Sequence, residues 1–229
     1  MTLPLYRLTP LLWLSASVAL YLGGAHLYSF LSHSRTRQII VGRAWPLLIQ
    51  ALYYLGLPYV ALLRGDVLPR LLGLTDLDWI ADIGAGVGLG FVMIVLALGS
   101  FRYAGLGVTW PAPARQRRSG AVTWLWQAII LQSHAAFYRA TLIPVFDNLY
   151  WGAFASLIPQ ALEIALDPRR RRRLSDEAEA PLEIARWSIL LGATALYLFA
   201  RNLPLLIALS WLAEMGIAAV AASRPAQAT

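Results

Sequence analysis

The chain has 229 residues, of which 59% are hydrophobic and 14% are charged, and its formal net charge is +7. All 19 basic residues are arginine, and the chain contains no cysteine. This composition excludes a disordered chain, because far too much apolar sequence is present. It also excludes disulfide bonds and zinc–thiolate sites.

Apolar runs of bilayer length follow one another along the chain. About 20 apolar residues span the hydrocarbon core as a helix, and runs without strict alternation are not barrel strands. The runs cover residues 8–31, 45–63, 79–101, 122–145, 150–166 and 187–222. The last run is too long for one span, and Arg201-Asn202-Leu203-Pro204 divides it. We therefore predict an all-α, polytopic membrane helix bundle of about seven transmembrane helices, forming one integral membrane domain over residues 1–229.

The arginines are divided unequally between the two sides of this bundle. Numbering the loops alternately gives 14 arginines on one side and 4 on the other, while Arg139 lies within a span. Cytoplasmic loops of membrane proteins are enriched in arginine, so we expect an outside amino terminus and a cytoplasmic carboxyl terminus in the plasma (inner) membrane. The net charge thus points to the lipid bilayer rather than to a nucleic-acid partner. A loop is predicted over residues 167–186. Its arginine run 169–173 is expected to anchor the topology, or to contact anionic lipid.

Ionisable residues inside predicted spans are candidates for a functional site, because they are costly in a bilayer. At a rise of about 1.5 Å per residue, His134 and Glu214 both fall near mid-depth, so we expect them to pair. Arg139 and Glu163 lie nearer the two faces, and Asp82 is expected at an interface. The alternative is that these side chains only link helices to one another.

The glycines from Gly84 to Gly90 lie within the third span. They do not form the GxGxxG nucleotide motif, because Leu89 takes the place of its third glycine. Gly84/Gly88 and Gly86/Gly90 instead form pairs of small residues, which predict close helix packing. We expect no cofactor and no metal ion.

Three short segments follow one another in an order that is informative. They are His134-Ala-Ala-Phe-Tyr-Arg139, Pro159-Gln-Ala-Leu-Glu163 and Ser210-Trp-Leu-Ala-Glu214. In order and spacing they resemble the EExxxR, FxxxH and HxxxN motifs of the CAAX-protease and bacteriocin-processing (CPBP) family of glutamic-type intramembrane peptidases. The resemblance covers residues 102–222, including a loop over 105–111 similar to the family's GL-x-x-P segment. It implies a CPBP-like core with its motif positions at His134, Arg139, Glu163, Ser210 and Glu214.

The departures from those motifs bear on activity. His134 and Ala135 stand where the family has its paired glutamates, one of which activates a water, and Glu163 and Ser210 replace its histidines. We therefore expect a scaffold without peptidase activity, which binds or helps to assemble another membrane protein or complex. Two alternatives stay open. One is an active intramembrane endopeptidase with Glu163 or Glu214 as the general base, and the other is a small transporter using His134 and Glu214.

Overall fold

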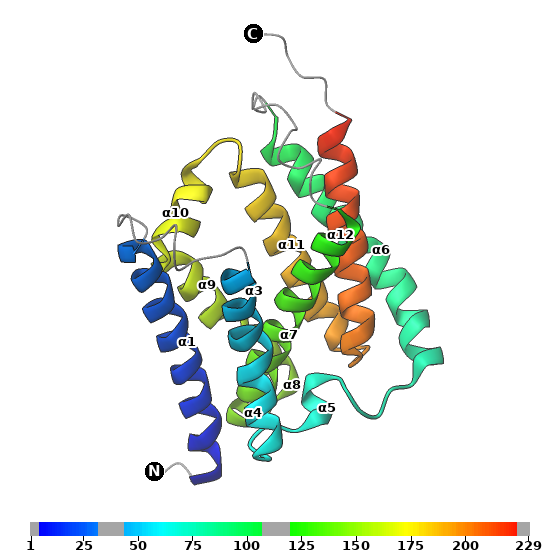
Figure 1. Ribbon diagram of the computed structural model, residues 1–229. Helices are drawn as coiled ribbons and strands as arrows, with labels where there is room; N and C mark the ends of the chain where they lie inside the picture. Colours follow the sequence, from blue (N-terminus) through cyan, green and yellow to red (C-terminus); the bar gives the residue numbers. More distant parts are fainter. Residues whose placement is uncertain (1–4, 32–43, 107–119, 224–229) are drawn as a thin grey trace. The chain divides into compact units, whose positions relative to one another are not determined.

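The computed structural model describes residues 5–31, 44–106 and 120–223 (Figure 1). The described residues form helices joined by short connections, and no strand occurs among them. The predicted all-α class is therefore confirmed. Most of the segment that resembles the GL-x-x-P loop lies outside the described residues. The helices are α1 (Leu5–Leu31), α3 (Ala44–Ala51), the π-helix η1 (Leu52–Gly56), α4 (Leu57–Leu63), α5 (Pro69–Leu72), α6 (Trp79–Ala104), α7 (Ala121–Phe146), α8 (Leu149–Ala155), α9 (Leu157–Leu166), α10 (Pro168–Ser175), α11 (Ala180–Tyr197) and α12 (Leu203–Ala222).

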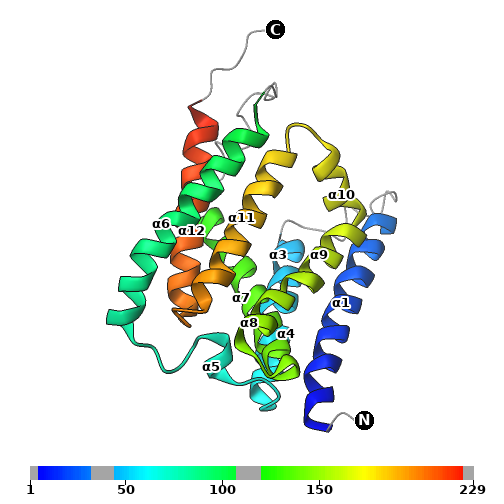
Figure 2. The same cartoon turned by 180° about the vertical axis from the view of Figure 1, so that it is seen from behind.

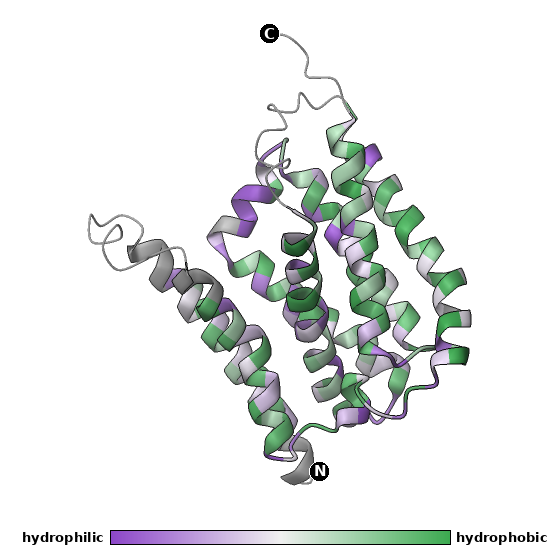
Figure 3. Ribbon diagram, turned by 45° about the vertical axis from the view of Figure 1, so that its right-hand side comes forward, coloured by the Kyte–Doolittle hydropathy of each residue, from purple (hydrophilic) through white to green (hydrophobic). Residues whose placement is uncertain are grey.

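Three helical stretches are long and apolar enough to cross a membrane. They are Trp79–Ala104, Leu149–Leu166 and Leu203–Ala222, and the apolar stretch Leu48–Leu63 is shorter. Figure 3 shows hydrophobic residues along most of the long helices, whereas the arginine-rich α10 is hydrophilic. These three stretches indicate a membrane protein.

One predicted boundary is wrong, and one predicted span contains a break. The fifth apolar run has the predicted extent, Leu149–Leu166, but it is interrupted at Ser156, between α8 and α9, where Pro159 has no N–H to donate to the carbonyl of Ala155. The charged segment 167–186 was expected to be a loop, but it contains α10 and the first turns of α11. A proline in the first turn of α11 and a Glu183–Arg186 ion pair of 3.2 Å both favour this helix.

The chain divides into two compact units. Unit 1 comprises Met1–Leu72 and Ser133–Arg171, and unit 2 comprises Gly73–Gln132 and Arg172–Thr229. Helix α7 begins in unit 2 and ends in unit 1, so the predicted core over residues 102–222 draws on both units. That a single domain covers the chain stays a prediction.

Unit 1 contains α1, α3, η1, α4, α5, α8, α9 and the second half of α7. Helices α1 and α9 pack against each other, and α8 folds back closely on α7. A Cβ added at Gly152 of α8 would clash with the backbone of Ile143, at 2.7 Å from its nitrogen, so only glycine permits this approach. Helix α4 ends in a Schellman motif with Gly65 in the left-handed region (φ 74°).

Unit 2 is built on α6, α11 and α12, which lie side by side in both views (Figures 1 and 2). A Cβ added at Gly86 or Gly90 would lie within 2.9 Å of the side chains of Leu205 and Leu209 on α12, respectively. Close packing at this pair of glycines is therefore confirmed. Gly84 and Gly88 have open space beside them, so the prediction is wrong for that pair within the described residues.

The division between the sixth and seventh apolar segments falls where it was predicted. Helix α11 ends at Tyr197 and α12 begins at Leu203, with Asn202 as its N-cap accepting from the Leu205 N–H at 3.0 Å. The Asn202 amide also donates to Asp82 at 3.1 Å. Asp82 was expected at an interface, and in the structure it is a buried hydrogen-bond acceptor that ties α6 to this cap.

Candidate functional site

The five candidate residues are divided between the two units. His134 and Arg139 on α7 and Glu163 on α9 belong to unit 1, whereas Ser210 and Glu214 on α12 belong to unit 2. All five side chains are buried.

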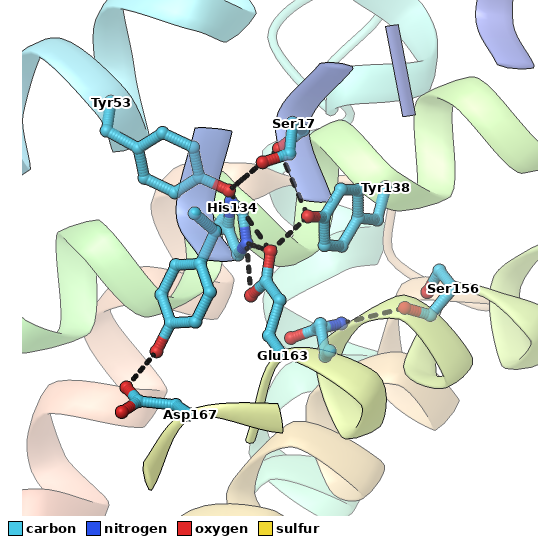
Figure 4. Close-up of polar contacts among 9 residues, drawn as sticks. Ser17, Tyr53, His134, Tyr138, Ser156, Glu163 and Asp167 are labelled. Atoms are coloured by element: carbon cyan, nitrogen blue, oxygen red, sulfur yellow. Dashed lines mark hydrogen bonds and ion pairs between the residues drawn. The ribbon is translucent and has the colours of Figure 1, made fainter. Parts of the chain in front are cut away.

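The carboxylate of Glu163 is the centre of the polar cluster in unit 1 (Figure 4). The His134 Nε2 lies 3.0 Å from Glu163 Oε2 and 3.1 Å from Oε1. The hydroxyl of Tyr53 donates to Oε1 at 3.0 Å, and the hydroxyl of Tyr138 donates to the same oxygen. A carboxylate offers about four lone-pair sites, so three side chains from two other helical segments occupy most of its accepting capacity.

The π-helix η1 brings Tyr53 to this carboxylate. A single turn of π-helix shifts the register of the residues that follow it, and such turns often occur at functional sites. Two successive tyrosines, Tyr53 and Tyr54, both reach His134: their ring centroids lie 5.4 Å and 4.8 Å from that of the imidazole. Tyr54 meets the imidazole edge to face, an arrangement that aromatic rings favour.

Helix α1 completes the cluster through Ser17, which is fully buried. The Ser17 hydroxyl lies 2.8 Å from that of Tyr53 and 3.1 Å from that of Tyr138. Towards the end of α9, Tyr21 of α1 donates to Asp167 at 2.8 Å, and the Arg170 guanidinium lies over the Tyr21 ring. Hydroxyl groups thus connect α1, η1 and α7 to the carboxylates of α9 and its C-cap.

His134 and Glu214 were predicted to pair, but they lie in different units and each has a partner within its own unit. In unit 1 His134 contacts Glu163, and in unit 2 Glu214 forms an ion pair with Arg186 at 3.5 Å. Depth along a helix was the only basis for that prediction, and depth does not tell which helices are packed together or which side each residue faces.

The two candidate residues on α12 have partners within unit 2. Ser210 accepts a hydrogen bond of 2.8 Å from the Gln132 amide of α7. The Arg186 guanidinium donates to Glu183 at 3.2 Å and to Gln127 at 2.8 Å, besides its ion pair with Glu214. Arg139 lies on α7 in unit 1, and its side chain is fully buried.

Four members of the unit 1 cluster were missed as site residues by sequence reasoning: Ser17, Tyr53, Tyr54 and Tyr138. The sequence could have identified them by their positions within apolar runs, because a hydroxyl group there needs a hydrogen-bond partner. Tyrosine is nevertheless common in membrane helices, so this signal does not distinguish a cluster from interfacial anchoring.

The cluster offers an imidazole and a carboxylate in direct contact, the combination that general acid–base catalysis uses. The hydroxyl donors on Glu163 also restrain it strongly. Among the described residues, no three His, Asp or Glu side chains form a group that could hold a metal ion.

Comparison of the chain with protein family models, curated proteins and solved structures gives no match. The helical fold and the three membrane-length stretches thus define the class, a helical membrane protein.

Proposed function

We propose that the chain is an integral membrane protein with seven spans, an outside amino terminus and a cytoplasmic carboxyl terminus in the plasma (inner) membrane. Helical residues cover most of each of the seven apolar segments, and three of the helical stretches are long and apolar enough to cross a membrane. The arginine asymmetry between alternate sides supports this orientation.

We further propose that it is a CPBP-like scaffold that binds or helps to assemble another membrane protein, without peptidase activity. The observation that carries this proposal is the occupation of Glu163 by His134, Tyr53 and Tyr138. A general base must have a lone pair directed at the water it activates. In this cluster most of the lone pairs of Glu163 accept hydrogen bonds from the protein itself. These bonds, with those of Ser17, link α1, η1, α7 and α9.

One observation favours the second candidate, an active glutamic-type endopeptidase. His134 and Glu163 stand at positions similar to the glutamate and histidine of two CPBP motifs, and they are in contact. A reciprocal exchange of the two residue types keeps a carboxylate–imidazole pair. In this alternative, a substrate would have to displace a tyrosine hydroxyl from Glu163 before water could bind there.

A cleavage assay distinguishes the scaffold from the peptidase. We expect the wild-type protein, reconstituted in liposomes, to cleave prenylated and signal-derived membrane peptides no faster than its Glu163→Gln variant does, at the background rate. We also expect the chain, purified in mild detergent from its native membrane, to carry one partner at fixed stoichiometry, and Glu163→Gln to retain that partner. The measurements are peptide cleavage by mass spectrometry and the stoichiometry of the purified complex.

Glu179→Gln serves as the control, because Glu179 is half exposed and its ion pair, among the described residues, is with Arg173 of the same charged segment. Cleavage by the wild type and by this control, lost in Glu163→Gln, would establish the peptidase in place of the scaffold. Purification of a stable chain without any partner would contradict the assembly role.

A further inference from the structure

Unit 2 contains a second buried polar cluster, formed by α7, α11 and α12. At its centre, Glu214 is 1% exposed and its Oε1 lies 3.5 Å from Arg186 Nε. Ser210 lies one helical turn before Glu214 on α12, and Gln132 bonds to it. Gln132 and Ser210 are both fully buried.

Two oxygens of this cluster accept no hydrogen bond. They are Glu214 Oε2 and Gln132 Oε1, both inaccessible to solvent, and no donor within the described part of the chain reaches either of them. A buried acceptor without a donor costs about 1–3 kcal/mol, and more when it is charged. Because Gln132 bonds to Ser210, one turn from Glu214, both oxygens belong to the same short stretch of the α7–α12 contact.

The charges around Glu214 do not balance. Two arginines, Arg173 and Arg186, pair with three glutamates, Glu179, Glu183 and Glu214. With every group ionised, this set carries one uncompensated negative charge. Arg186 already divides its guanidinium between Glu183, Gln127 and Glu214, so it satisfies only one oxygen of the Glu214 carboxylate.

We propose that Glu214 is the binding site for one monovalent positive charge, delivered to its Oε2 as a proton or as a sodium ion. Either occupant removes the net negative charge and gives Oε2 a partner. A sodium ion would in addition take Gln132 Oε1 and the Ser210 hydroxyl as oxygen ligands. Carboxylates within membrane spans commonly serve such ion and proton sites.

The surroundings of Glu214 support a single charge rather than a divalent ion. Arg186 is the one cation paired with Glu214 among the described residues, and Glu214 Oε2 is a fully buried carboxylate oxygen without a hydrogen-bond donor. On α6, which also packs against α12, Asp82 is held by Asn202, and Arg102 and Tyr103 are exposed near its end. The site does not depend on the proposed assembly function.

The test is the thermal stability of the purified protein in detergent micelles, followed by tryptophan fluorescence. Sodium chloride is titrated against choline chloride at constant ionic strength, at pH 8.5 and at pH 6. A ligand that binds only the folded protein, at about a hundredfold excess over its dissociation constant, raises the Tm of a chain of this size by about 5–10 °C. We expect a rise with sodium if the ion is the occupant, and a rise at the lower pH without sodium if it is the proton.

Glu214→Gln should abolish either response, because glutamine is neutral and donates its own hydrogens. Glu177→Gln, at an exposed position outside the charged set, should keep it. If Glu214→Gln does not fold, infrared spectra of the wild type and Gln132→Leu provide the second measurement. A buried protonated carboxylic acid band supports the proton, and a weaker sodium response in Gln132→Leu supports the ion. A wild-type Tm unaffected by both sodium and pH, with no such band, would overturn the proposal, as would an unchanged response in Glu214→Gln.

Discussion

Replacement of Glu163 by alanine should lower the free energy of unfolding by about 3–5 kcal/mol, the range for breaking a buried charged pair. The substitution removes the acceptor from His134, Tyr53 and Tyr138 at once. His134 and Tyr138 are buried, so water does not replace the lost acceptor there. The measurement is unfolding of the purified protein in mixed micelles of rising denaturing-detergent content.

Two variants serve as controls for this effect. Glu163→Gln keeps one accepting oxygen and should cost less than Glu163→Ala. Glu179→Ala removes a half-exposed ion pair with Arg173 and should change stability by no more than about 1 kcal/mol. If Glu163→Ala were no more costly than Glu179→Ala, the cluster around Glu163 would not link the helices of unit 1 as the structure indicates.

Replacement of Gly73 by alanine should cost more than about 3 kcal/mol through two separate effects. Gly73 has φ of 75°, where a residue with a Cβ is strained by about 1–2 kcal/mol. The added Cβ would also lie 2.9 Å from both the Arg201 carbonyl oxygen and the Leu203 nitrogen, which are backbone atoms and cannot turn away. The Gly73 carbonyl accepts from the Leu203 N–H at 2.9 Å, so the clash displaces the start of α12.

Gly65 is a matched control for the second effect. It has nearly the same φ, 74°, but a Cβ at Gly65 has nothing within 4 Å among the described residues. Gly65→Ala should therefore cost only the conformational strain, about 1–2 kcal/mol. The difference between the two variants in the same unfolding assay measures the backbone contact at the start of α12. Equal losses would show that this contact is looser than the structure has it.

The helices of this chain could be predicted well because they depend on local properties. Apolar length identified the segments, and the polar sequence Arg201-Asn202 followed by Pro204 located the start of α12, where Asn202 caps the helix through its own side chain. The prediction was wrong for residues 167–186, because a segment rich in charged residues was interpreted as a loop and is largely helical. There, Glu183 and Arg186 are one turn apart and stabilise the helix that their charge appeared to exclude.

The candidate site was predicted less completely. The sequence predicted His134 and Glu163 as site residues, because an ionisable group within an apolar run is costly in a bilayer. In the structure both residues lie in one cluster. Tyr53 joins that cluster only because η1 is a π-helix, a change of register that the apolar sequence of the run does not reveal. Ser17 joins it from more than 100 residues before Tyr138 in the chain.

Composition and local pattern were sufficient for the helical class, the apolar segments and the list of costly buried groups, because each follows from residues that are neighbours in sequence. The choice of partners depended on tertiary packing: His134 meets Glu163, and Glu214 meets Arg186. A buried charge requires a partner, but several polar side chains at the same depth could serve as that partner. The faces that the helices turn towards one another decide which of these side chains is in contact with the charge.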